Sequence, residues 1–227
     1  MTHPAREETL SKIKAALKTG AHQKISSLGD YAKSSSAEIR RRCDDRREHL
    51  IEQFKTELTR IGGHLFQAAN FAAASQYVGQ LAVAAGAKRV VGWDAPLIEK
   101  IALEKFGVEF LLDRAGESDF VKTAIGSDVG ITTVDYALAD TGTLVLISGQ
   151  GRARAASLLP PVHVALVETR QIIAGLDDLF GLLAENDGEL ASAVTFITGP
   201  SRTADIELTL VVGVHGPQQL HVCLLAE

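Results

Sequence analysis

The sequence predicts a three-layer α/β fold with a mostly parallel sheet, preceded by N-terminal helices. Beyond residue 62, short apolar runs alternate with segments whose apolar residues recur at helical spacing. Strands interleaved with helices are typical of βαβ units, in which helices cover both faces of a parallel sheet. The chain has 227 residues, of which 46% are apolar and 22% charged, so it can bury one substantial core.

The first 61 residues are predicted to form an N-terminal helical extension, and residues 62–227 the α/β domain. Apolar residues recur every three or four positions over 5–18 and again over 37–61, which predicts two amphipathic helices. A segment rich in Ser, Gly and Lys separates the two, and a pair of glycines at Gly62 ends the second.

Within the α/β domain the same patterns give the order of the elements. Strands are expected at residues 64–67, 89–92, 109–112, 128–133, 142–148, 162–168, 194–198 and 220–225. Helices are expected at residues 71–85, 96–106, 134–139 and 175–184.

Composition excludes several classes of function. The net charge of −5 and a pI near 5.8 give no electrostatic reason to expect a nucleic-acid partner. No apolar run approaches the roughly 20 residues that span a bilayer. The N-terminus lacks an apolar segment followed by a cleavage site, so we expect no secretory signal and a cytoplasmic location.

The two cysteines, Cys43 and Cys223, lie far apart in the sequence and form no C-x-x-C pair. An iron–sulfur cluster of the common kind needs four thiolates, and cysteine-rich zinc sites need similar sets, so neither is expected in this chain. A disulfide is disfavoured in a reducing compartment. We therefore expect two inert thiols. His215 could ligate a metal together with His163 and nearby acids, but no H-x-x-x-H or similar spacing supports this, so no metal site is expected.

Three segments carry polar residues beside apolar strands, at 134–148, 149–163 and 197–217. Open α/β sheets bind ligands in the crevice beyond the carboxyl ends of their strands. The three polar segments therefore predict one shared site.

The first segment contributes Asp140, Thr141, Gly142 and Thr143. A glycine lets the backbone approach a ligand closely, and a carboxylate beside two hydroxyls can bind a polar substrate or act as a general base. The alternative is a tight helix-to-strand turn whose side chains bond local backbone groups.

The second segment contributes Arg154, Ser157 and His163 as candidate ligand-binding residues. It begins like a dinucleotide-binding loop, but Arg154 replaces the third glycine, which argues against an NAD site. A guanidinium suits a carboxylate or phosphate. No G-x-S-x-G motif surrounds Ser157, so a serine hydrolase is disfavoured and a structural or ligand-contact role is expected.

The third segment contributes the candidates Ser201, Arg202, Thr203, Asp205, Glu207 and His215. Ser201 is interpreted as the N-cap of a helix that follows the strand, which would leave free N–H groups for an anion. Asp205 and Glu207 are candidate catalytic carboxylates, as is Asp140. Capping of Ser201 and a pair between Arg202 and Asp205 would be the structural alternative.

These motifs resemble a known family. ADTGTL at 139–144, the set Arg154, Ser157, Pro160 and His163, and TGPSRTADIE followed by GVHGP are similar to the lactate-utilization (LUD) domain, LutC/YkgG branch. The resemblance covers residues from Gly62 to the C-terminus. It implies the fold shared by sugar-phosphate isomerases and CoA transferases (NagB/RpiA-like). It also implies a role in oxidising L-lactate to pyruvate beside partners that carry iron–sulfur clusters.

Because the chain has no cluster ligands and no flavin or nicotinamide motif, the first hypothesis is a non-redox subunit that binds a small anionic substrate or organises the complex. A second is a stand-alone enzyme that acts on an acyl-CoA or sugar phosphate through a carboxylate nucleophile or base. A third is an interaction protein whose N-terminal helices dock a partner.

Overall fold

The computed structural model describes residues 11–12, 34–114, 119–184, 192–204 and 210–226. A six-stranded sheet forms the centre of the molecule, and all its neighbouring strands are parallel. Its order is β1-β12-β7-β4-β2-β3. These strands are β1 (His64–Ala68), β2 (Arg89–Trp93), β3 (Glu109–Asp113), β4 (Val129–Thr133), β7 (Val162–Glu168) and β12 (Gln219–Leu225).

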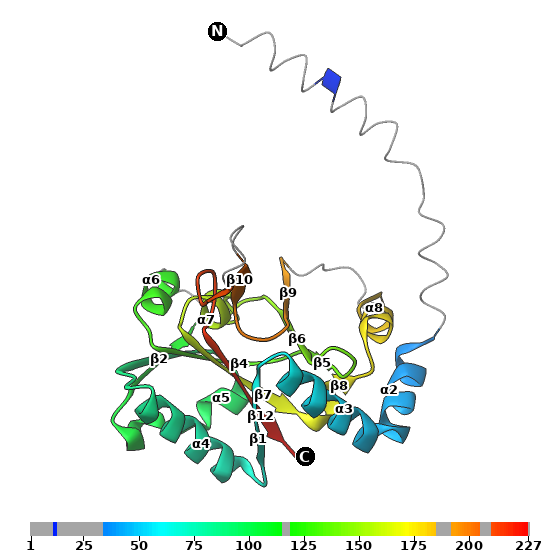
Figure 1. The fold of residues 1–227 in the computed structure, drawn as a ribbon, viewed down its shortest axis with the longest axis horizontal. Coiled ribbons are helices and arrows are strands. Elements are labelled where there is room, and N and C mark those ends of the chain that lie inside the picture. Colours follow the sequence, from blue (N-terminus) through cyan, green and yellow to red (C-terminus); the bar gives the residue numbers. More distant parts are fainter. Residues whose placement is uncertain (1–10, 13–33, 115–118, 185–191, 205–209, 227) are drawn as a thin grey trace.

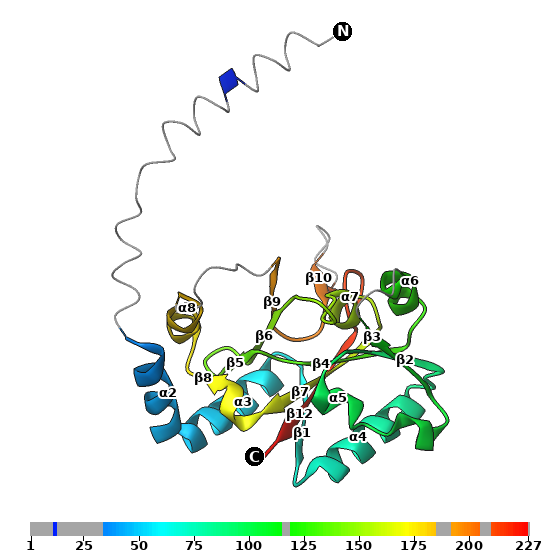
Figure 2. The same cartoon turned by 180° about the vertical axis from the view of Figure 1, so that it is seen from behind.

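Helices cover both faces of this sheet (Figure 1 and Figure 2). The α-helices of the described residues are α2 (Ser36–Asp45), α3 (Arg47–Arg60), α4 (Phe71–Ala84), α5 (Pro96–Glu99), α6 (Phe120–Ile125), α7 (Ala155–Leu158) and α8 (Leu176–Ala184). Of these, α2 packs against α3 and α8. Gly92 faces Ile98 of α5, whereas Gly130 faces Ala156 of α7. Gly92 pairs with Ile131, the neighbour of Gly130, so α5 and α7 lie on opposite faces because side chains alternate along a strand. The predicted three-layer α/β fold is confirmed.

The eight predicted strands are all present, but two of them lie in a second sheet. This four-stranded sheet has the order β8-β5-β6-β9. Its strands are β5 (Tyr136–Leu138), β6 (Thr143–Ile147), β8 (Ile172–Ile173) and β9 (Val194–Ile197). It is inserted into the connections that link β4 to β7 and β7 to β12.

The helix predicted over 134–139 is wrong, because these residues contain strand β5, which pairs with β6 as an antiparallel hairpin. Ala137 and Leu138 are 0% and 1% exposed, so both faces of this short strand are buried and no polar face distinguishes helix from strand.

Two predicted helices are interrupted. The helix expected over 37–61 divides into α2 and α3 at Arg46, whose ψ of 15° departs from helical geometry. The one expected over 96–106 becomes α5 and a 3₁₀ turn at Leu103–Phe106. The break lets Ile98, Ile101 and Leu103 all reach the core.

The N-terminal helices that the structure describes pack against the α/β domain. Leu50, Phe54 and Leu58 of α3 are at most 1% exposed and belong to the main hydrophobic core. The helix predicted over 5–18 lies outside the described residues, apart from Ser11 and Lys12. In the part of the chain that is described, no helix has both the length and the apolar character needed to cross a membrane.

Candidate functional site

A groove of about 550 Å³ lies where the C-terminal end of α3, helix α7 and the segments flanking β10 (Arg202–Ala204) meet. This volume is within the usual range for small-molecule sites. Its lining includes five side chains that can bind a polar ligand: Arg60, Ser157, Ser201, Arg202 and His215. Four of these are residues that the sequence predicted, and they come from two of the three polar segments.

The loop that carries Ser201 is held in place by close packing at Gly199 and by backbone hydrogen bonds. Gly199 has φ +84°, and a Cβ there would lie 2.7 Å from the carbonyl oxygen of Ile61, so only glycine fits against the end of α3. The Ser201 N–H donates to the Pro217 carbonyl at 2.8 Å, and the Ser201 carbonyl accepts from the Gly213 N–H at 3.0 Å. The side chain of Ser201 is therefore presented on a braced turn.

The prediction that Ser201 caps a helix is wrong. Strand β10 follows it and pairs antiparallel with β11 (Leu210–Val212). An anion at Ser201 would therefore meet side-chain donors rather than the first turn of a helix.

Two arginines give the groove its positive charge. A Cβ on Gly62 would lie 2.3 Å from Nη2 of Arg202, which shows that the guanidinium packs over the bare backbone at the end of α3. Among the described residues, no carboxylate forms an ion pair with Arg202. Arg60 is paired with Glu57 within its own helix at 2.6 Å. Because Arg202 is exposed and unpaired there, it is the guanidinium best placed to bind an anion.

Thr143 joins the first polar segment to this groove. Its hydroxyl lies 2.9 Å from the hydroxyl of Thr198, which itself lines the groove. Thr143 is 4% exposed, so its direct role is to hold Thr198 in place.

Asp140, Thr141 and Gly142 lie elsewhere, in the hairpin turn between β5 and β6. The Thr141 hydroxyl donates to the Asp140 carboxylate at 3.1 Å, and Gly142 has φ +66°. A Cβ on Gly142 would lie 2.4 Å from the backbone nitrogen of Leu58 in α3. A local turn is present, but it joins two strands rather than a helix and a strand, and its hydrogen bond links two side chains. Asp140 is exposed beside Gly175.

The Gly149–Arg154 loop lies over the carboxyl ends of β2 and β3. The Asp94 N–H donates to the Gly151 carbonyl at 2.9 Å, and the Asp113 carboxylate accepts from the Ala153 N–H at 2.6 Å. The strand order reverses its direction between β2 and β4, the position at which open α/β sheets commonly bind ligands. In this protein, the Gly149–Arg154 loop lies at this position.

Of the two arginine side chains in this loop, Arg152 is the one that contacts other described residues. Its guanidinium pairs with Asp135 at 2.7 Å and stacks on the Trp93 ring, whereas Arg154 is exposed. Sequence reasoning missed Asp135 and Asp113. The signal that could have found them is an acid directly at the end of an apolar strand.

His163 lies in the core and not in the groove. It is 0% exposed, its Nε2 lies 2.9 Å from the Thr132 hydroxyl, and burial lowers its pKa to about 3. The Ser157 hydroxyl donates to the Arg154 carbonyl at 3.1 Å. Ser157 and His163 therefore bond other groups and do not form a nucleophile–base pair with one another.

Of the remaining candidates, Thr203 lies in β10, and Asp205 and Glu207 lie outside the described residues. Within the described ranges, no three His, Cys, Asp or Glu side chains gather as metal ligands would. Cys43 and Cys223 are both free and buried.

Comparison with known proteins identifies the family. A family model described as the LUD domain matches residues 51–225. The chain belongs to the LUD domain family. The match begins inside α3, so the LUD domain of this chain includes the helix that borders the groove.

Relatives named lactate utilization protein C place this LUD domain more closely. The protein of that name from Anoxybacillus flavithermus is 32% identical over 74% of this chain and 76% of its own length. That from Halalkalibacterium halodurans is 39% identical over 58% of this chain and 60% of its own length. The aligned region thus spans about 60% of the latter relative.

A solved structure shares the fold. A DUF162 family protein from Deinococcus radiodurans superposes with a TM-score of 0.52 at 21% identity, covering 80% of this chain and 98% of that one.

Proposed function

We propose that this LUD domain protein is a non-redox component of a lactate-utilization system, which binds a small carboxylate in the groove at Ser201 and Arg202. The observation that carries the proposal is the convergence of Ser201, Arg202 and His215 on one groove beside the end of α3. A guanidinium that has no ion pair with the described residues, together with a hydroxyl and an imidazole, offers the donors that a 2-hydroxy or 2-oxo acid would use. The relatives named lactate utilization protein C support this choice of ligand class.

Electron transfer is assigned to partner proteins. Oxidising lactate requires a group that takes up two electrons, and the two cysteines of this chain are too few for an iron–sulfur cluster of the four-cysteine kind. We therefore propose that iron–sulfur subunits act with this chain in the cytoplasm, and that the chain itself holds or delivers the acid.

Binding is tested by isothermal titration of the full-length protein with L-lactate and with pyruvate. We expect saturable binding of at least one acid, and Arg202→Gln should weaken it about tenfold, which corresponds to one charge-assisted hydrogen bond. Arg41→Gln, which removes an exposed arginine far from the groove, is the matched control. Equal affinity in both variants, or no binding of either acid, would overturn the assignment of the groove.

The partner is tested separately. Tagged protein is purified from cells grown on lactate, and co-purifying proteins are identified and assayed for iron and acid-labile sulfide. Recovery of an iron–sulfur protein in fixed ratio supports the subunit role. A protein recovered alone would instead favour a stand-alone enzyme, and screening with CoA esters and sugar phosphates would follow.

A further inference from the structure

A second cleft, of about 610 Å³, lies between α2 and the small sheet, bordered by the 3₁₀ turn at Thr169–Gln171. It shares no lining residue with the groove at Ser201. Its size is that of a small-molecule site. Neither the family match nor the function proposed above assigns a role to it.

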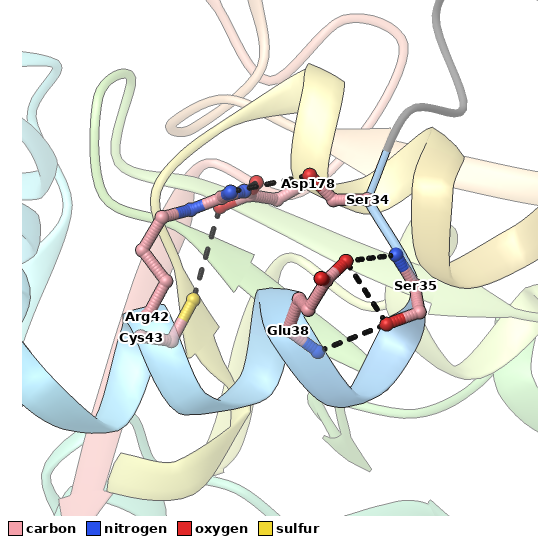
Figure 3. Close-up of polar contacts among 6 residues, drawn as sticks. All are labelled: Ser34, Ser35, Glu38, Arg42, Cys43 and Asp178. Atoms are coloured by element: carbon pink, nitrogen blue, oxygen red, sulfur yellow. Dashed lines mark hydrogen bonds and ion pairs between the residues drawn. The ribbon is translucent and has the colours of Figure 1, made fainter.

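The wall formed by α2 is firmly attached (Figure 3). At the start of the helix, Glu38 accepts from the Ser35 N–H at 2.8 Å while the Ser35 hydroxyl accepts from the Glu38 N–H at 3.3 Å, which is a capping box. Further along, Arg42 forms an ion pair with Asp178 of α8, and the Cys43 thiol contacts the same carboxylate at 3.8 Å. The capping box stabilises the start of α2 itself, and the contacts with Asp178 attach the helix to α8.

The opposite end of this wall is also fixed. Arg47, the first residue of α3, donates to the carbonyl oxygens of Thr169 at 2.9 Å and of Ile172 at 2.6 Å. Its guanidinium lines the cleft and is bonded there to two carbonyl oxygens and to Asp44. A site with walls braced in this way is preorganised, so a ligand pays little to order it.

The charge in the cleft is positive although the chain as a whole carries −5. Three arginines line it, against two aspartates. Asp135 is already paired with Arg152 at 2.7 Å, and Asp44 with Arg47 at 2.6 Å. Among the described residues, no carboxylate forms an ion pair with Arg40, which leaves its guanidinium available for a ligand.

Arg40 shares the cleft with a tyrosine hydroxyl that has no hydrogen bond to the described residues. Tyr136 of β5 lines the same cleft, and burial raises the pKa of its phenol while the positive charge of Arg40 acts in the opposite direction. The phenol is therefore a neutral O–H donor at physiological pH. A guanidinium and an O–H donor that face one space can together bind a single anionic group.

The remaining lining comprises Cys43, Gln171 and four apolar side chains, of which Ile39, Ile173 and Leu182 are buried in the core and Ile147 is partly exposed. We propose that this cleft binds an organic anion, with its carboxylate, sulfonate or phosphate on Arg40 and Tyr136 and its apolar part beside Ile147. This site is independent of the groove at Ser201, so either can fail without the other.

The probe is 8-anilinonaphthalene-1-sulfonate, an aromatic sulfonate whose fluorescence rises on leaving water, titrated into the folded full-length protein. We expect one saturable site. Arg40→Gln should weaken it about tenfold, the loss of one charge-assisted hydrogen bond, and Tyr136→Phe by a smaller factor. Arg40 is exposed, and Tyr136→Phe keeps the aromatic ring that packs against the core, so both variants should keep the far-UV spectrum of the parent.

Two controls decide the result. Arg41→Gln removes the adjacent charge on α2 outside the cleft, and Arg202→Gln removes the key cation of the other groove. The proposal stands if both controls bind the probe as the parent protein does. It is overturned if binding does not saturate, if Arg40→Gln leaves the affinity unchanged, or if Arg41→Gln weakens it equally.

Discussion

The guanidinium carbon of Arg152 lies 4.4 Å from the centroid of the Trp93 ring, above the carboxyl end of β2. The same guanidinium is 2.7 Å from Asp135, whose carboxylate also accepts from the Ile147 N–H at 2.6 Å. The Trp93 indole N–H donates to the Ala153 carbonyl at 3.0 Å. Arg152 thus connects the main sheet to the small sheet, because the Asp135 carboxylate accepts hydrogen bonds from both Arg152 and the Ile147 N–H.

Asp135 is therefore expected to matter for stability. Asp135→Ala leaves the Ile147 N–H without its acceptor and Arg152 without its counter-charge, which should lower the free energy of unfolding by about 2 kcal/mol. Urea denaturation measures this. Glu109→Ala, which breaks the exposed pair with Arg89, is the control and should cost less than about 1 kcal/mol. Similar losses in the two variants would contradict the connecting role.

Gly142 is expected to tolerate no side chain. Gly142→Ala would place a Cβ 2.4 Å from the Leu58 backbone nitrogen at a φ of +66°, so it combines a steric clash with backbone strain. Gly86 is the matched control, since it has φ +64° but no atom within 4 Å of its Cβ position. We expect a loss of about 1 kcal/mol for Gly86→Ala from strain alone and clearly more for Gly142→Ala, read from thermal or urea unfolding. Equal losses of stability in the two variants would show that α3 shifts to accommodate the added methyl group.

Buried histidines should make the protein sensitive to mild acid. Burial lowers the pKa of His163 to about 3 and that of His221 to about 4, below the unfolded value near 6.5. The unfolded chain therefore takes up protons first, so stability is complete above pH 6.5 and falls as the pH drops from there toward 4. The slope for each histidine approaches about 1.4 kcal/mol per pH unit.

Urea unfolding at pH 7, 6 and 5 measures this slope. His221→Gln should remove about half of the proton-linked loss between pH 6 and 5, whatever it does to the stability at pH 7. His49→Gln, an exposed histidine on α3, is the control and should keep the parent slope. A parent protein as stable at pH 5 as at pH 7 would mean that these imidazoles are charged in the fold.

The attachment of α2 can be followed through Cys43. Arg42→Ala removes the ion pair with Asp178, so α2 should open locally more often and Cys43 should react about tenfold faster with a disulfide reagent. Cys223, with a pKa raised by burial to about 12, should stay protected in β12. Arg41→Ala should leave the rate for Cys43 unchanged, and an increase as large as that of Arg42→Ala would argue against the ion pair as the attachment.

The strands were predictable because a parallel sheet is buried on both faces. Runs such as Val164–Val167 in β7 are apolar at successive positions, which distinguishes them from the neighbouring segments before their partner strands are known. The second sheet was not predictable in the same way. Strand β5 has three residues, and what makes it a strand is its pairing with β6 and β8, which local periodicity does not encode.

The candidate groove was predictable in part. Ser201, Arg202 and His215 share it because the turn before β12 is bonded to the loop after β9, and polar residues flanking the two strands indicated that. Asp140 and Thr143 are three positions apart in one motif, yet one lies on an exposed turn and the other beneath Thr198. Their separation depends on which face of β6 points to the groove, and a single sequence does not fix that.

Any truncated version of this protein must retain helix α3 to keep its fold. Phe54 and Leu58 fill the core, and Arg60 and Ile61 form one side of the groove. Removing residues 1–61 would therefore remove side chains of the hydrophobic core together with one side of the groove. A failed pull-down with such a fragment would say nothing about docking by the N-terminal residues. A fragment that begins at Ser34 keeps each described contact of α2 and α3. Comparing its partner binding with that of the full-length protein tests whether the residues before Ser34 recruit a partner.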